Sequence, residues 1–251
     1  MKKALITGAS SGIGRAIAKR LSQMGYEVIL VARRKDRLEM LQKELETKSY
    51  VASIDLSDID CVKKLVMDFP DIDILVNNAG LGVYGKFCET DFERESQMID
   101  VNIRALHYLM KAYLPELKKR GGKILNVASS AAFFSGPFLS SYYASKAYVL
   151  RLSRAVREEM RREGAAVSIS VLCPGPVETE FGEVSGSNLG KKALKAEYVA
   201  QVAVDAMFKN KAVIVPGFIM KCSHVLSKIC PESLSVRLLY KLQEAKKKTS
   251  C

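Results

Sequence analysis

The sequence predicts an α/β protein: a single doubly wound domain built on a parallel sheet of about seven strands. Two observations carry this prediction. Short, nearly continuous apolar runs alternate along the chain with longer segments whose apolar residues recur at helical spacing. A glycine-rich turn joins the first apolar run to the first helical segment. Apolar strands that alternate with helices are typical of a parallel sheet covered on both faces.

The expected strands are seven apolar runs, at residues 3–7, 27–32, 50–54, 73–77, 123–128, 166–173 and 212–215. Helical spacing predicts helices between them, over residues 13–24, 36–46, 59–69, 92–119, 141–163 and 196–210. Neither a linker nor an internal repeat interrupts this alternation. We therefore expect one domain over residues 1–216.

Residues 217–251 are expected to form a helical C-terminal extension. Apolar residues recur at helical spacing on both sides of Pro231, which predicts two helices. They are Ile219, Cys222, Leu226 and Ile229 before the proline, and Leu234, Leu238, Leu239 and Leu242 after it. Because two apolar stripes need a partner surface, we expect the extension to pack on the same domain, as a lid over the substrate cleft or a dimer contact beside it. Basic residues outnumber acidic ones in this segment, so docking on a membrane surface is the alternative.

Composition excludes several classes of protein. The chain of 251 residues has a net charge of +12, but its basic residues are spread among acidic neighbours, which indicates a solvated surface rather than a nucleic-acid site. The six cysteines include no Cys-x-x-Cys pair and there are only two histidines, so we expect neither a disulfide framework nor a metal site. No stretch approaches 18 apolar residues, and the expected location is cytoplasmic.

Tyr142 and Lys146 are four residues apart in the segment S-S-Y-Y-A-S-K, so they share one face of the helix predicted there. A phenol has an ordinary pKa of about 10. A cation about 4 Å away would favour the phenolate by roughly 4 kcal/mol at an effective dielectric constant of about 20. Such a pair can exchange protons near neutral pH, which predicts general acid–base chemistry.

The turn at residues 8–14 reads G-A-S-S-G-I-G and opens the first predicted helix. Glycines let the backbone approach a diphosphate closely, and the free N–H groups at the start of a helix bind anions. The turn therefore predicts a dinucleotide site.

In combination, these motifs resemble the short-chain dehydrogenase/reductase family. The cofactor turn of that family matches T-G-A-S-S-G-I-G at residues 7–14, and its structural tetrapeptide matches N-N-A-G at residues 77–80. Motifs follow in the family's order over about residues 3–180. The resemblance implies a Rossmann fold and NAD(P)-dependent hydride transfer between the nicotinamide and a carbonyl or secondary alcohol.

The resemblance also implies roles for four catalytic residues. Ser129 precedes Tyr142 by the family's usual separation and should bond the substrate oxygen, with Ser130 as the alternative. Tyr142 should transfer the proton, Lys146 should lower the pKa of that tyrosine and hold the nicotinamide ribose, and Asn102 should anchor a water. The cofactor-binding residues implied are Gly8, Ser10, Ser11, Gly12, Ile13, Gly14, Arg33, Arg34, Asp55, Leu56, Asn78, Ala79, Gly80, Tyr142, Lys146, Pro174, Gly175, Val177 and Thr179. By family analogy the protein is a homodimer or homotetramer.

The end of the second predicted strand indicates a preference for NADP(H). Relatives that use NAD carry an acid there, whereas this chain has Ala32 followed by Arg33 and Arg34. Guanidinium groups can hold a 2′-phosphate bidentately, and we expect Arg33 to lead with help from Arg34. The alternative is a pair of solvated arginines that open a helix.

Loop residues near the expected site are largely apolar and include no cation to hold a carboxylate. They are Val83, Tyr84, Phe133, Phe134, Phe138, Leu139, Tyr143 and Val177. This favours an apolar small-molecule carbonyl compound or alcohol as substrate. Two alternatives remain open, a catalytically idle dinucleotide-binding regulator and a membrane-peripheral reductase that modifies lipids.

Overall fold

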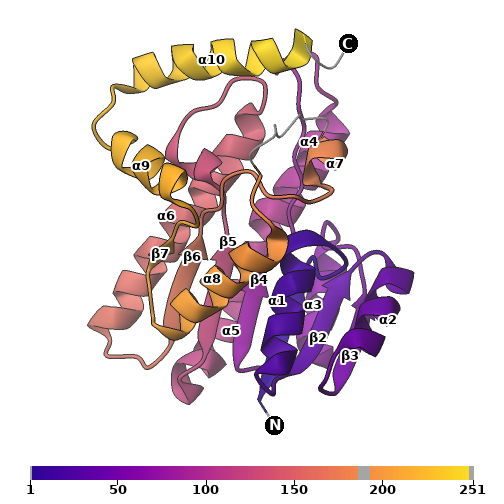
Figure 1. Ribbon diagram of the computed structural model, residues 1–251. Helices are drawn as coiled ribbons and strands as arrows, with labels where there is room; N and C mark the ends of the chain where they lie inside the picture. Colours follow the sequence, from indigo (N-terminus) through magenta and orange to yellow (C-terminus); the bar gives the residue numbers. More distant parts are fainter. Residues whose placement is uncertain (1, 186–192, 249–251) are drawn as a thin grey trace.

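The computed structural model describes residues 2–185 and 193–248. Within them, seven parallel strands form one sheet in the order β3-β2-β1-β4-β5-β6-β7 (Figure 1). The strands are β1 (Lys3–Thr7), β2 (Glu27–Ala32), β3 (Ser49–Ser53), β4 (Ile74–Asn77), β5 (Lys123–Val127), β6 (Ser168–Leu172) and β7 (Val213–Ile214). The predicted fold class is confirmed, with strand ends shifted by one or two residues.

Helices cover both faces of the sheet, because successive strand residues point to opposite sides and both sets are apolar. Ala4 and Ile6 pack on one side with α1 (Gly12–Gln23), α2 (Lys35–Glu44) and α8 (Ala196–Phe208). Leu5 packs on the other side, where the covering helices are α3 (Ile59–Asp68), α5 (Leu106–Arg120) and α6 (Ser140–Arg162). The core therefore lies in two layers with the sheet between them.

The segment predicted as one helix over residues 92–119 is divided. It consists of α4 (Phe92–Ile99), a π-helical turn η1 (Asp100–Ala105) and α5. The wider turn holds Asn102, whose side chain is buried. Such turns often occur at functional sites, and sequence periodicity does not predict them.

Hydrogen bonds join the carboxyl ends of β1 and β4, the neighbouring strands at which the strand order reverses. The Thr7 Oγ1 atom accepts hydrogen bonds from the backbone N–H groups of Asn78 (2.9 Å) and Ala79 (3.0 Å). The Asn78 Nδ2 atom donates to the Thr7 carbonyl oxygen at 2.9 Å. Ligands of open α/β sheets bind in the crevice that lies outside the carboxyl ends of the strands at such a point.

The C-terminal extension contains the two predicted helices, α9 (Phe218–Leu226) and α10 (Glu232–Lys248), with Pro231 between them. In Figure 1, α10 crosses the end of the molecule opposite the N-terminus. It is attached by the Tyr84 hydroxyl, which donates to the Gln243 carbonyl at 2.8 Å, and by the Tyr240 ring against Phe138. The apolar stripes face solvent in the single chain rather than the cleft, and the alternative of a dimer contact stays a prediction. No helix in the described ranges has both the length and the apolar character needed to span a membrane.

Replacing Thr7 by valine should destabilise the fold at the crevice. The substitution keeps the shape of the side chain but removes the acceptor of two N–H groups, each of which then loses a partner. We expect the free energy of unfolding to fall by about 1–3 kcal/mol, whereas Thr7→Ser should retain most of it. Urea denaturation measures both variants. Equal stability of the valine and serine variants would show that these hydrogen bonds do not hold the crevice.

Candidate active site

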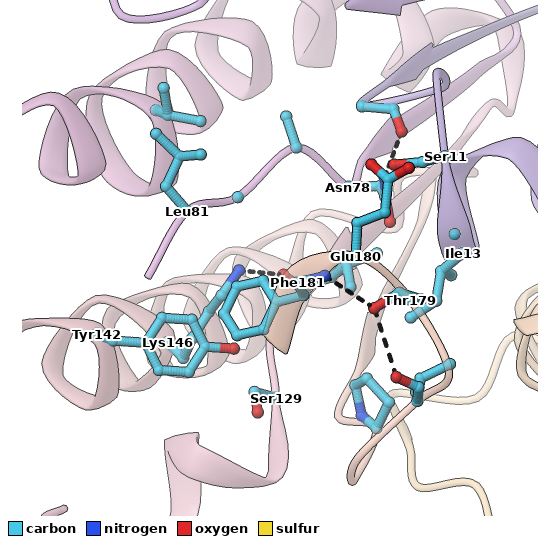
Figure 2. A pocket seen from close by; sticks show the side chains of 18 of the residues that line it. Ser11, Ile13, Asn78, Leu81, Ser129, Tyr142, Lys146, Thr179, Glu180 and Phe181 are labelled. Atoms are coloured by element: carbon cyan, nitrogen blue, oxygen red, sulfur yellow. Dashed lines mark hydrogen bonds between the residues drawn. The ribbon is translucent and has the colours of Figure 1, made fainter. Parts of the chain in front are cut away.

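A cleft of about 440 Å³ lies along the carboxyl ends of the strands. Figure 2 shows Ser129, Tyr142 and Lys146 in one part of it and Ser11 and Ile13 in another. All of the predicted site residues line this cleft except Gly14 and Asn102. Gly14 packs against the Gly8 carbonyl behind the glycine turn, leaving no room for a Cβ atom. Asn102 lies behind Gly80.

The phenol of Tyr142 is buried at the end of the cleft lined by the predicted catalytic residues Ser129, Tyr142 and Lys146, which is here called the catalytic end after that prediction. Burial raises the pKa of Tyr142 to about 12, while a hydrogen bond with Ser129 acts in the opposite direction. Ser129 lines the same part of the cleft, and its Oγ accepts a hydrogen bond from the Ala131 N–H at 3.1 Å. Ser130 lines the same cleft.

Lys146 does not act on Tyr142 as we expected. Its Nζ donates to the Val127 carbonyl at 3.1 Å and lies 5.8 Å from the centroid of the Tyr142 ring. Burial lowers the pKa of Lys146 to about 8. Since desolvation outweighs the hydrogen bond with Ser129, the pKa of Tyr142 rises rather than falls.

Asn102 holds the backbone that borders the catalytic end. Its Oδ1 accepts from the Leu81 N–H at 2.8 Å, and its Nδ2 donates to the Leu81 carbonyl and the Ser145 hydroxyl, both at 3.0 Å. A Cβ atom at Gly80 would lie 3.0 Å from Lys146 Nζ and 3.2 Å from Asn102 Oδ1. Asn102 therefore ties η1, α6 and the segment after β4 together around the lysine.

At the opposite end of the cleft, Arg34 points inward. Its guanidinium donates to the hydroxyls of Ser10 and Ser11, both at 3.1 Å, and to the Glu180 carboxylate at 2.7 Å. Arg37 forms a second ion pair with Glu180. The two guanidiniums lower the pKa of Glu180. By contrast, Arg33 is half exposed and lies 3.8 Å from Asp55.

The residues at this end fit a dinucleotide. Helix α1 begins after Ser11, which makes no side-chain cap, and its first turn contains no acidic residue. Its N-terminal N–H groups are thus free to bind a diphosphate. Gly8 and Gly12 have φ angles of +66° and +53°, which favour glycine in this turn. Among the described residues, no group of His, Cys, Asp and Glu could hold a metal ion.

Four further residues at the site were missed by sequence reasoning. Arg37 lies one helical turn after Arg34, and Glu180 and Phe181 directly follow Thr179. Their closeness to predicted site residues in the sequence is the signal that could have found them. Gln243 of α10 has no sequence signal, yet it is buried and lines the cleft. The Phe181 ring lies 5.2 Å from the Tyr142 ring. Five of the loop residues we expected near the substrate, Val83, Tyr84, Phe133, Phe134 and Phe138, do not line the cleft.

Comparison with known proteins decides the family. Residues 2–189 match the family model described as short chain dehydrogenase. The chain belongs to this family. Short-chain dehydrogenases are NAD(P)-dependent oxidoreductases that act on CH–OH or C=O groups, and this chain is one of them.

Relatives and solved structures agree with that assignment. An uncharacterized oxidoreductase of Staphylococcus epidermidis is 39% identical over 212 residues, covering 82% of this chain and 90% of the relative. A short-chain dehydrogenase from Sphingobium yanoikuyae in complex with NADPH is 27% identical with a TM-score of 0.82, over 91% of this chain and 94% of that one. A family member from Burkholderia phymatum in complex with NAD is 25% identical with a TM-score of 0.78, over 90% and 92% of the two chains.

Replacing Lys146 by methionine should change how stability depends on pH. Below pH 8 the lysine is protonated in both the folded and the unfolded chain, so the cost of burying the charge is fully present. Between pH 8 and 10.5 the folded chain releases the proton and the unfolded chain keeps it, so the wild type gains stability. From pH 7 to about 9.5 the wild type should gain roughly 2 kcal/mol relative to Lys146→Met. Denaturant unfolding at several pH values measures this, and parallel pH profiles would contradict it.

Proposed function

We propose that this protein transfers hydride between NADP(H) and an apolar carbonyl compound or secondary alcohol, with Tyr142 as the general acid/base. The observation that carries the proposal is that Tyr142 and Ser129 line one end of a cleft whose other end is lined by Arg34. A proton donor, a second hydroxyl and a phosphate-binding cation are thereby brought to one cavity. The carbonyl chemistry of the family uses the two hydroxyls, and the 2′-phosphate of NADP(H) would use the cation.

The protein's residues handle the proton and the substrate oxygen, and bound NADPH supplies the hydride. Ser129 donates a hydrogen bond to the carbonyl oxygen and places it beside the phenol. Tyr142 is protonated at neutral pH, because burial raises its pKa to about 12, so it is ready to act as an acid in the direction of reduction. Asn102 acts through Leu81 and Ser145 to position this end of the cleft.

Lys146 contributes in two ways. Its pKa of about 8 leaves the ammonium charged at neutral pH, and that charge stabilises negative charge as it develops on the oxygens nearby. The same ammonium lies beside Gly80, where it can hold the nicotinamide ribose. The side chain therefore serves binding and chemistry from one position.

The substrate is proposed to be apolar because the wall near Tyr142 is formed by Leu81, Ala131, Leu139 and Phe181. The polar groups contributed beside them are the Tyr143 hydroxyl and the Gln243 amide, which lie 3.4 Å apart. Neither carries a charge that would bind a carboxylate.

The preference for NADP(H) is proposed to rest mainly on Arg34. The sequence favoured Arg33 as the leading residue, but Arg34 points into the cleft and Arg33 is directed towards Asp55. A 2′-phosphate would compete with Glu180 for the Arg34 guanidinium, because both are anions that bind the same donors. The predicted homodimer or homotetramer, the cytoplasmic location and the division at residue 216 stay predictions.

Replacing Tyr142 by phenylalanine should abolish turnover and leave NADPH binding nearly unchanged. The substitution removes the proton donor but keeps the ring, so kcat should fall by about 10²–10⁴-fold. NADPH oxidation with an aromatic ketone measures the rate, and fluorescence titration measures binding. Tyr148→Phe is the matched control, since Tyr148 lies on the same helix as Tyr142 and its hydroxyl contacts His107 of α5. A Tyr142→Phe enzyme with more than about a tenth of the wild-type rate would refute the assignment of Tyr142 as the general acid/base.

Replacing Arg34 by alanine should weaken NADPH binding selectively. Loss of charge-assisted hydrogen bonds to the 2′-phosphate should raise the Kd for NADPH about 10- to 150-fold, with little change for NADH. Arg33→Ala is the comparison, and its effect should be several-fold smaller. Calorimetric titration with both cofactors measures these changes. Equal affinity of the wild type for NADPH and NADH would remove the basis for an NADP(H) preference.

A further inference from the structure

Large apolar side chains are concentrated on the outer surface of α9 and α10. More than half of those exposed in the described part of the chain lie between residues 218 and 242. They are Phe218, Ile219, Val225, Leu226, Ile229, Leu234, Leu238, Tyr240 and Leu242. Scattered exposed apolar residues are normal, but a concentration of this kind marks an interaction site.

On α10 the apolar residues form one stripe. Leu234, Leu238 and Leu242 are spaced four residues apart and are 59%, 58% and 53% exposed. Gln243, on the side of the helix that faces the domain, is 6% exposed and lines the cleft. The stripe is therefore the face of α10 that the domain leaves uncovered.

Helix α9 has the same arrangement. Its inner side carries Met220, which packs beside Gly175, and His224, whose ring lies 4.1 Å from that of Phe133. Phe218 and Val225 point away from those contacts and are 80% and 60% exposed. Both helices lie at the end of the molecule opposite the N-terminus (Figure 1). The cluster of these exposed residues, 218–242, is here called the tail surface.

Charge distinguishes the occupants that this surface could take. Lys221, Lys228, Arg237 and Lys241 are exposed among the apolar residues. Arg237 and Lys241 follow Leu234 and Leu238 by three residues, so they border the α10 stripe. Residues 217–251 contain more basic than acidic residues, and the whole chain has a net charge of +12. Like charges oppose the pairing of two such surfaces, whereas an anionic surface attracts them.

We propose that the tail surface binds an anionic phospholipid bilayer. The apolar stripes enter the boundary between headgroups and acyl chains, and the lysine and arginine side chains contact lipid phosphates. Because Gln243 on the inner face of α10 lines the cleft, docking places the cleft next to the lipid phase. An apolar substrate concentrates in that phase. The proposal concerns a surface separate from the catalytic residues and does not depend on the proposed reaction.

Vesicle sedimentation of the full chain tests the proposal. The wild type should sediment with vesicles of phosphatidylcholine and phosphatidylglycerol, sediment much less with phosphatidylcholine alone, and be released by high salt. The triple variant Leu234→Ser, Leu238→Ser, Leu242→Ser should lose at least about 10-fold in partitioning. Arg237→Gln with Lys241→Gln should lose about 30-fold, because each charge near an anionic surface contributes about 1 kcal/mol.

The matched control replaces apolar residues that are exposed elsewhere. Met24→Ser, Met40→Ser and Met67→Ser together should leave sedimentation unchanged, since these residues lie outside the tail surface. NADPH titration of each variant confirms that the fold is retained. Equal sedimentation of the wild type and the leucine variant would overturn the proposal. So would a wild type that sediments with neither kind of vesicle. A leucine variant that instead converts a dimer to a monomer, with no vesicle binding by the wild type, would assign the tail surface to a second copy of the chain.

Discussion

The structure depends on the hydrogen bonds between Thr7 and the segment that follows β4. They close the carboxyl ends of β1 and β4, the two strands from which the sheet extends in opposite directions. The glycine turn starts directly after Thr7 and the Asn78–Gly80 backbone starts directly after β4, so one small set of bonds sets the floor of the cleft. The cofactor end and the catalytic end are both built outward from this point.

Burial decides the electrostatics of the catalytic end. Removing Tyr142 and Lys146 from water disfavours the charged form of each, which raises the pKa of the phenol and lowers that of the amine. The two shifts separate the pKa values of the two groups. At neutral pH the tyrosine keeps its proton and the lysine keeps its charge. Two hydrogen bonds stabilise this arrangement. The Val127 carbonyl accepts one from the Lys146 ammonium, and Asn102 donates the other to the hydroxyl of the neighbouring Ser145.

Much of this architecture could be predicted from sequence. Apolar runs and helical spacing located the strands and helices, because each buried layer imposes its own period, and motif spacing located Ser129, Tyr142 and Lys146. The rest depends on three-dimensional packing. The π-helical turn around Asn102 changes a helix by a fraction of a turn, which apolar spacing does not record. Arg34 and Arg37 form ion pairs with Glu180, and Gln243 enters the cleft beside Tyr143. In each of these contacts the two partners are more than 90 positions apart in the sequence. The exposure of the tail stripes likewise depends on which face of each helix reaches the domain.

A single-turnover experiment shows whether this cleft transfers hydride. Protein saturated with NADPH is mixed with an apolar aromatic ketone, and absorbance at the nicotinamide band is followed together with formation of the alcohol. We expect one alcohol for each NADPH oxidised, and a slower transfer when C4 of the nicotinamide carries deuterium. Tight NADPH binding with no reduction of any ketone or aldehyde tried would contradict it, because the residues assembled around Tyr142 would then hold a cofactor that they do not use.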